Sequence, residues 1–152
     1  MARFIQETDY GMQIKQEVIK LLTAGAENWY DSPKLVRAEQ TAVRQIKHWL
    51  GPRPVRLQNY DLDAIFNASA PEERDEYIVT ITIDVALYHL YSQTGMKDIP
   101  AHRQQRYQDV LDWLKEAGSG NISANLPVVT PPGGEEYGEF MFQSRNPQNH
   151  KW

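Results

Sequence analysis

The sequence predicts an all-α fold, with about four main helices in a small bundle and an extended C-terminal arm. Apolar residues recur every three or four positions in four segments of the 152-residue chain, which is the period of an amphipathic helix. Caps, prolines and glycines bound these segments where helices begin and end. No run of alternating polar and apolar residues indicates a strand. We therefore expect one helical domain over residues 1–127 and an arm over residues 128–152.

The first helix is predicted over residues 9–23. Thr8 or Asp9 offers a side-chain oxygen for the N-cap, and Gly25 lies where the helix would end. The apolar residues at helical spacing in this segment are Ile14, Val18, Leu21 and Leu22.

The second helix, over residues 33–50, has the clearest boundaries. Ser32 is a suitable N-cap, and Pro33 suits the first helical position because its missing N–H needs no partner there. Gly51 and Pro52 end the helix. Its apolar stripe consists of Leu35, Ala42, Val43, Ile46, Trp49 and Leu50.

Residues 51–70 form a connector. Pro52 and Pro54 exclude a regular helix at its start, and a single helical turn is expected over residues 62–66. Its apolar residues are expected to dock on the core: Leu57, Tyr60, Leu62, Ile65 and Phe66.

The third helix is predicted to begin at a capping box formed by Ser69 and Glu72 and to run to about Thr94. This length corresponds to roughly 35 Å. Residues 78–83 are β-branched and have strand propensity. We still predict a helix, because the capping box and the helical spacing agree with each other. Apolar residues lie on more than one side, so we expect a central helix.

The fourth helix is predicted to open at Pro100 and to end at Gly118, with Tyr107, Val110, Leu111 and Leu114 as its apolar residues. Beyond Pro127 the chain holds three prolines and three glycines and shows no helical period. Yet this segment also carries side chains typical of interfaces: Tyr137, Phe140, Met141, Phe142 and Trp152. The segment either binds a partner through these anchors or folds back on its own domain, and we favour the partner.

Composition and motifs exclude several classes of site. The chain has no cysteine, so it has no disulfide and no thiolate metal site. None of the four histidines has a metal-ligand spacing, and no phosphate-binding loop or nucleophile elbow occurs. We therefore expect no enzyme activity, no cofactor and no metal. No apolar run approaches the length of a membrane span, so we expect a soluble protein made in the cytoplasm.

The charge distribution argues against tight binding to nucleic acid. The chain has 20 acidic and 16 basic side chains, a formal net charge of −4, and the two signs are interspersed. Proteins that grip duplex DNA usually present a basic stripe to the phosphates. A mildly acidic surface is instead compatible with a channel through which DNA slides, because like charges prevent sticking.

Three consecutive segments resemble one family. Residues 82–95 read TIDVALYHLYSQTG, residues 99–118 read IPAHRQQRYQDVLDWLKEAG, and residues 119–127 read SGNISANLP. The order D-[IV]-A-x-Y-x-[LI]-[YH], then R-Y-x-x-[AV]-[LI]-x-W-L, then I-x-x-x-L-P is similar to a domain-of-unknown-function family of Mu-like prophage proteins. That family is grouped with the head-tail connector, or adaptor, proteins of tailed bacteriophages. The resemblance is firmest over residues 71–127.

Asp84 is the one carboxylate inside the apolar stretch of the third helix, between Ile83 and Val85. A charge at such a position needs a partner. Arg106 accompanies Asp84 in the family pattern, so the resemblance implies an ion pair between the third and fourth helices. We favour this structural role over a catalytic one. Likewise, we assign Tyr88, Tyr91, Tyr107 and Trp113 to helix packing rather than to stacking on bases.

The resemblance implies a structural virion protein in the neck of a phage particle. Such connectors form a homo-oligomeric ring beneath the portal protein, join it to tail or head-completion proteins and leave a channel for DNA. The alternative is a small helical regulatory or DNA-binding protein of a prophage, against which the net acidity stands. The sequence leaves open the number of copies in a ring and the partner of the arm.

Overall fold

The computed structural model describes residues 3–24, 26–54, 56–68, 70–94 and 98–129. Six α-helices occur in these residues: α1 (Glu7–Tyr10), α2 (Gln16–Leu22), α3 (Pro33–Leu50), α4 (Leu62–Phe66), α5 (Glu76–Gln93) and α6 (Ala101–Ser119). A short 3-10 helix covers Pro71–Glu73. The described chain contains no strand, only an isolated bridge between Tyr60 and Val128. The predicted all-α fold is confirmed.

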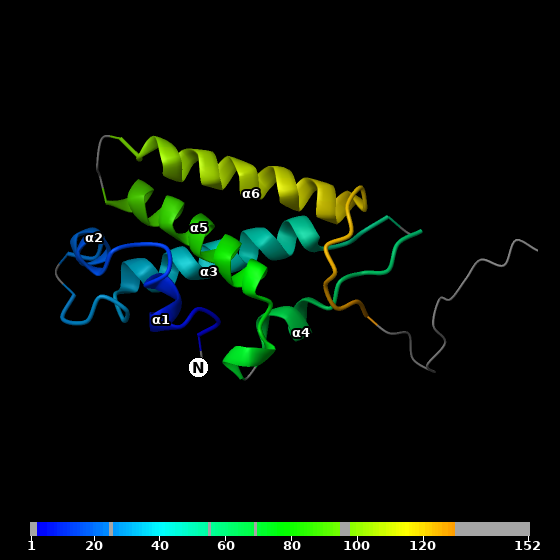
Figure 1. Ribbon diagram of the computed structural model, residues 1–152, viewed down its shortest axis with the longest axis horizontal. Coiled ribbons are helices and arrows are strands. Elements are labelled where there is room, and N and C mark those ends of the chain that lie inside the picture. The colour runs from blue at the N-terminus through cyan, green and yellow to red at the C-terminus, as the bar shows by residue number, and fades with distance from the viewer. Residues whose placement is uncertain (1–2, 25, 55, 69, 95–97, 130–152) are drawn as a thin grey trace, which may run out of the picture.

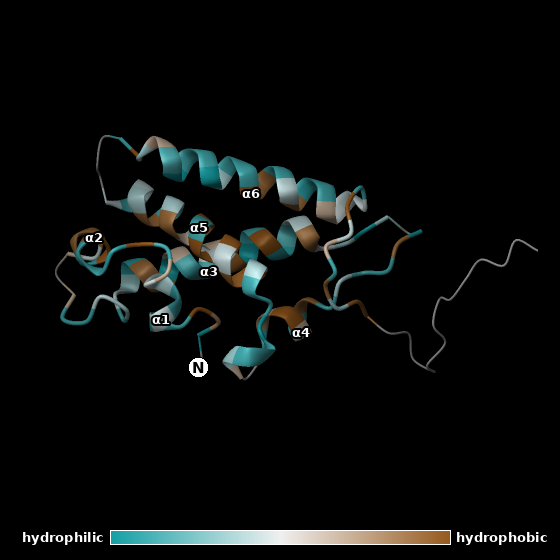
Figure 2. Ribbon diagram, viewed as in Figure 1, coloured by the Kyte–Doolittle hydropathy of each residue, from teal (hydrophilic) through white to brown (hydrophobic). Residues whose placement is uncertain are grey.

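The three long helices form the body of the domain (Figure 1). Helix α5 contacts both α3 and α6, and α3 also contacts α6. The chain direction reverses from α3 to α5 and again from α5 to α6. In α5, 10 of 18 residues are buried, and they lie on all sides of the helix. Figure 2 shows this helix as largely hydrophobic, whereas α6 is mostly hydrophilic. The prediction of a central third helix, and of helix rather than strand at residues 78–83, is confirmed.

Helix α3 begins and ends as predicted. Pro33 occupies the first turn after Ser32, and the helix ends at Leu50 before Gly51. The Ser32 side chain makes no capping hydrogen bond, although its carbonyl accepts the Val36 N–H at 3.0 Å. The buried residues of α3 lie at helical spacing: Leu35, Ala38, Glu39, Ala42, Ile46 and Leu50. Val43 and Trp49, which we assigned to the same stripe, are half-buried at its edge.

The first predicted helix was wrong as one continuous element, because α1 and α2 are separate helices. In an unbroken helix the Gln13 carbonyl would accept the N–H of the residue four positions later. Here it accepts from Arg103 Nη2 at 2.8 Å. A bond to α6 therefore replaces a helical bond at this break. Leu21, one of the apolar residues at helical spacing in this segment, is 76% exposed.

The start of the third helix was also wrong. The segment around Pro71 is a 3-10 turn, and α5 begins at Glu76. Arg74 lies between them with an extended backbone (φ −78°, ψ 139°), which breaks the helical path. Asp75 is the N-cap, and its carboxylate accepts the Ile78 N–H at 2.9 Å. The 18 residues of α5 span about 27 Å, less than the predicted length.

The connector and the end of the described chain pack on each other. Helix α4 confirms the predicted turn, and Tyr60, Ile65 and Phe66 are buried as expected. The Asp61 N–H donates to the Pro127 carbonyl at 2.9 Å, and the Val129 N–H donates to the Asn59 carbonyl at 2.8 Å. Residues 128 and 129, which we placed in the arm, therefore pair with the connector. The rest of the predicted arm, residues 130–152, lies outside the described residues.

The end of α6 packs tightly against the end of α3. A Cβ atom at Gly118 would lie 2.4 Å from the Trp49 carbonyl oxygen, so glycine permits this close approach. The helix ends one residue later than predicted, at Ser119. Gly120 follows as a left-handed C-cap with φ 83°, a conformation that glycine adopts without steric cost.

Candidate functional site

Asp84 on α5 lies in a cluster with two arginines of α6. Arg106 Nε donates to Asp84 Oδ1 at 2.9 Å, and Arg103 Nη1 lies 3.6 Å from the same oxygen. The side chains of Asp84 and Arg103 are 6% and 7% exposed, whereas that of Arg106 is 50% exposed. The partner expected from the family pattern is therefore in place. A second and more deeply buried partner, Arg103, was missed.

Burial dominates the electrostatics of this cluster. It raises the pKa of Asp84 above its usual range, against the attraction of Arg106 and then Arg103. Burial also lowers the pKa of Arg103, and Asp84 supplies the largest opposing attraction. Two cations thus share one carboxylate in a region where an uncompensated charge is costly. The spacing of Arg103 and Arg106 was an available signal, because residues three apart share a helix face.

Arg103 also holds the N-terminal segment against α6. Its Nη2 atom donates to the Gln13 carbonyl. Its Nε and Nη1 atoms are buried and have no hydrogen-bond partner in the described part of the chain. Its guanidinium is therefore fixed by one carbonyl and by one carboxylate, that of Asp84. Arg103 links α5, α6 and the turn between α1 and α2.

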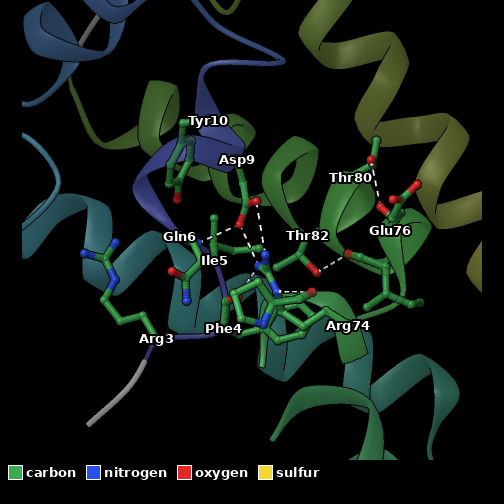
Figure 3. Close-up of polar contacts among 12 residues, drawn as sticks. Arg3, Phe4, Ile5, Gln6, Asp9, Tyr10, Arg74, Glu76, Thr80 and Thr82 are labelled. Carbon is green, nitrogen blue, oxygen red and sulfur yellow. Dashed lines mark hydrogen bonds and ion pairs between the residues drawn. The ribbon is translucent and has the colours of Figure 1, made fainter. Parts of the chain in front are cut away.

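A second arginine, Arg74, anchors the N-terminal segment from the side of α5 (Figure 3). Its Nη1 donates to the Phe4 carbonyl at 2.8 Å and to Asp9 Oδ2 at 2.6 Å, and its Nη2 donates to Asp9 Oδ1 at 3.2 Å. Asp9 Oδ2 also accepts the Gln6 N–H at 2.7 Å. The Arg74 side chain is almost fully buried. This two-oxygen contact fixes both the register and the direction of α1.

A third arginine, Arg3, ties the first described residue to α3. Its Nε donates to Glu39 Oε2 at 2.9 Å, and a second nitrogen contacts Glu39 Oε1. Glu39 also accepts the Tyr10 hydroxyl, so burial and this neighbouring carboxylate raise the pKa of Tyr10. The Arg3 guanidinium lies 3.7 Å from the centre of the Tyr30 ring, and the Tyr30 hydroxyl donates to the Ile5 carbonyl at 2.7 Å. Three arginines, Arg3, Arg74 and Arg103, therefore anchor residues 3–13.

A groove of about 440 Å³, which we call the α3 groove, lies between residues 3–5 and α3. The contributing residues of α3 are three or four positions apart and form one face: Val36, Glu39, Gln40, Val43, Arg44 and Lys47. Glu39 is engaged by Arg3. Neither Arg44 nor Lys47 forms an ion pair within 4.0 Å with another described residue. The groove therefore combines an apolar floor with free positive charge.

A second groove, of about 340 Å³, lies beside the Arg74 anchor. It is bordered by Asp9, Met12, Gln13, Pro71, Arg74, Glu76, Val79, Thr80 and Ile83. Gln13 Nε2 donates to the Thr80 carbonyl at 3.2 Å, and the Asp9 carboxylate is held by Arg74. Since its main charged groups bond to each other, this groove offers fewer free groups to a ligand than the α3 groove.

The aromatic residues singled out in the sequence join the long helices. The Tyr88 and Tyr107 rings stack at 3.9 Å with an interplanar angle of 3°. The Tyr107 hydroxyl accepts from Gln45 Nε2 at 2.8 Å, and Gln45 Oε1 lies 2.9 Å from His89 Nε2. This network spans α3, α5 and α6. Tyr91 is buried, and Trp113 meets the Tyr77 ring edge-on at 4.8 Å. These contacts agree with a packing role.

The remaining sequence candidates give no further geometry. Among the described residues, no group of three or more His, Asp or Glu side chains is placed to hold a metal ion. His48, His89 and His102 lie on three different helices, α3, α5 and α6. The predicted arm anchors, and the fourth histidine, lie outside the described residues: Tyr137, Phe140, Met141, Phe142, His150 and Trp152. No described helix is both long and apolar enough to cross a membrane.

Comparison with known proteins identifies the family. A family model described as "Bacteriophage Mu, Gp36" matches residues 5–141. The match covers the whole described domain except its first two residues, and it extends into the segment beyond residue 129. No curated protein and no solved structure matches the chain. The resemblance to Mu-like phage proteins drawn from residues 71–127 is confirmed, and the chain belongs to the bacteriophage Mu Gp36 family.

Proposed function

We propose that this phage-associated protein is a structural virion protein of the neck, a head-tail connector that forms a ring between the portal and the tail around the DNA channel. The observation that carries the proposal is membership of the bacteriophage Mu Gp36 family over residues 5–141. The connector motifs seen in the sequence support the finer assignment. They lie on α5, on α6 and on the chain that leaves α6.

The described charges support a structural role for this domain. Asp84, Arg103 and Arg106 join α5 to α6, while Arg74 and Asp9 fix the N-terminal segment. These groups are engaged within the domain. The α3 groove, in contrast, keeps Arg44 and Lys47 available at the surface. A ring needs such a surface, because each copy must present one face to a different face of the next copy.

The proposed relation to DNA is passage without sequence-specific binding. The net charge of −4 disfavours tight contact with phosphates. A ring with this charge would let DNA slide through its channel, because like charges repel.

A reconstitution experiment tests the proposal. The full chain is mixed with the portal protein of the same phage, and the product is examined by electron microscopy and by sedimentation. We expect a ring of this protein on the portal face that receives the tail. Heads from a phage lacking the gene should contain DNA but no joined tail, and added protein should restore joining.

A DNA mobility-shift measurement separates connector from regulator. We expect no specific complex with phage DNA at physiological salt. A complex specific for one operator-like sequence, together with no binding to portals, would replace the connector assignment with the prophage regulator.

A further inference from the structure

The α3 groove is suited to an acidic and aromatic peptide. Three cations border it, Arg3, Arg44 and Lys47, and one carboxylate, Glu39, lies within it, so its formal charge is +2. Arg3 and Glu39 neutralise each other. The remaining positive charge belongs to Arg44 and Lys47, which lie three positions apart on one face of α3. The exposed parts of three lining residues, Phe4, Val36 and Val43, form the apolar floor of the groove.

At the Lys47 end of this groove, the lining residues Phe4 and Lys47 lie against the ring of Phe66, which is buried and does not itself line the groove. Phe4 meets Phe66 of α4 with ring centres 5.0 Å apart and planes at 62°. Lys47 Nζ lies 5.4 Å from the centre of the same Phe66 ring. A peptide entering at this end would meet an aromatic edge and an ammonium group together. Both favour an aromatic residue that is next to a carboxylate.

The chain itself contains a segment with the complementary chemistry. Residues 135–142 read EEYGEFMF, with three glutamates, no cation and four large apolar or aromatic side chains. This segment carries a formal charge of −3. The family match over residues 5–141 includes every groove residue except Arg3 and Phe4, and all of this segment except Phe142.

We propose that residues 135–142 of one copy dock in the α3 groove of a second copy. The glutamates would lie beside Arg44 and Lys47, and the aromatic side chains would cover the floor formed by Phe4, Val36 and Val43. Val129 is held by Asn59, and the six residue steps from Val129 to Glu135 span at most about 22 Å. Glu135 can therefore extend up to this distance from the point where the described domain ends. The assignment to a second copy rests on the proposed ring, which requires two different surfaces to meet.

Cysteine cross-linking of full-length chains tests the contact, because the natural chain has no cysteine. One variant carries Gln40→Cys at the groove, and another carries Gln143→Cys just after the segment. The two are mixed and oxidised, and mixed dimers are identified by intact mass. We expect mixed dimers to dominate over both homodimers. Mixed dimers at no more than the statistical share would overturn the proposal.

Charge reversal shows whether the groove guides this contact. Arg44→Glu with Lys47→Glu in the Gln40→Cys chain should lower the yield of mixed dimers by about tenfold, because like charges would then oppose docking. The matched control is Lys34→Glu with Arg37→Glu, which makes the same charge change on an exposed part of α3 outside the groove. Thermal melts check that both variants fold. Equal losses in the two variants, or no loss in either, would overturn the proposal.

A charge swap tests whether the segment's glutamates meet the groove's cations, and a chain with both cysteines distinguishes the two possible sources of the segment. Changing Glu135, Glu136 and Glu139 to Lys in the Gln143→Cys chain should restore mixed dimers with the groove-reversed chain. A chain that carries both cysteines should likewise form chains linked between copies. Efficient closure within single chains, without mixed dimers, would show that the segment folds back on its own domain and would overturn the proposal.

The proposed function fails in a different way. If cross-linking succeeds but the protein does not bind portals, the groove contact stands and the connector assignment fails. If rings form on portals while the groove variants assemble normally, the connector assignment stands and this contact is wrong.

Discussion

Removing the Asp84 carboxylate should destabilise the domain more than removing Arg106. Asp84→Ala leaves Arg103 buried, 7% exposed, without an ion pair to any other described residue. Breaking a buried pair in this way costs about 3–5 kcal/mol, and we expect the lower value because Arg103 keeps its bond to the Gln13 carbonyl. In a chain of this size, about 3 kcal/mol lowers the melting temperature by roughly 6–12 °C.

Arg106→Ala removes a half-exposed partner, so we expect a loss of about 1 kcal/mol or less. Asp84 then retains Arg103 at 3.6 Å. The double variant should lose less than the sum of the two single variants, with a coupling of about 0.5–1 kcal/mol, because the Arg106 contact is already absent once Asp84 is removed.

Urea denaturation of the four proteins measures this cycle. Asp109→Ala on the exposed side of α6 is the matched control, since the one hydrogen bond of the Asp109 side chain in the described structure is to Gln105 on its own helix. We expect the control to stay within about 0.5 kcal/mol of the natural protein. Additive losses in the cycle would refute direct coupling of Asp84 and Arg106. A loss for Asp84→Ala as small as the control would refute the argument from burial.

Four further predictions follow from the same structure. Because burial raises the pKa of Asp84 in the folded state, the folded protein holds this proton at a pH where the unfolded chain has lost it. Stability relative to Asp84→Asn should therefore fall as pH rises from about 3.9, the pKa of a free Asp, to the raised pKa. Urea denaturation measures this, and a rise of stability in that window would contradict it. Arg74→Ala should lower the unfolding free energy by about 2–4 kcal/mol, because it leaves Asp9 and the Phe4 carbonyl without their partner. Relative to the natural protein, this variant should accelerate hydrogen exchange more in α1 than in α6. Equal acceleration in the two helices would argue against a local anchor. The purified chain should be folded and monomeric or weakly associated when dilute, forming rings most readily on the portal; light scattering with a thermal melt checks this, and an unfolded dilute protein would contradict it. Deleting residues 130–152 should change the unfolding free energy by less than about 0.5 kcal/mol while weakening ring formation. A deletion that begins at residue 127 should cost more, because it also removes the bonds to Asp61 and Asn59. If the shorter deletion unfolds the helices, the deleted segment belongs to the core.

Local sequence signals predicted the long helices well. Ser32, Pro33 and Gly51 act on their immediate neighbours, and they marked the ends of α3 correctly. The apolar residues around α5 likewise predicted a central helix, because a helix that is apolar on all sides has to be covered. The position of Asp84 in that stretch was enough to demand a cation. The family pattern named Arg106 for this role, and the structure places it at 2.9 Å.

The predictions failed where a distant residue competes with a local signal. The bond from Arg103 to the Gln13 carbonyl joins residues 90 positions apart, and it accompanies the break between α1 and α2. Arg74 leaves the helical path and pairs with Asp9, 65 positions away, so Asp75 rather than Ser69 caps α5. No pattern of neighbouring residues contains such pairings.

The sequence by itself determined the helical class, the boundaries of α3, the buried role of α5 and the need for a partner at Asp84. These properties follow from hydrophobic period, caps and the cost of a buried charge, all of which act within a few residues. Only the tertiary structure decided that Arg103 shares Asp84 with Arg106, that Arg3 and Arg74 anchor the N-terminal segment, and that residues 3–5 and α3 enclose a groove. Each of these depends on segments that meet only after the three long helices have packed.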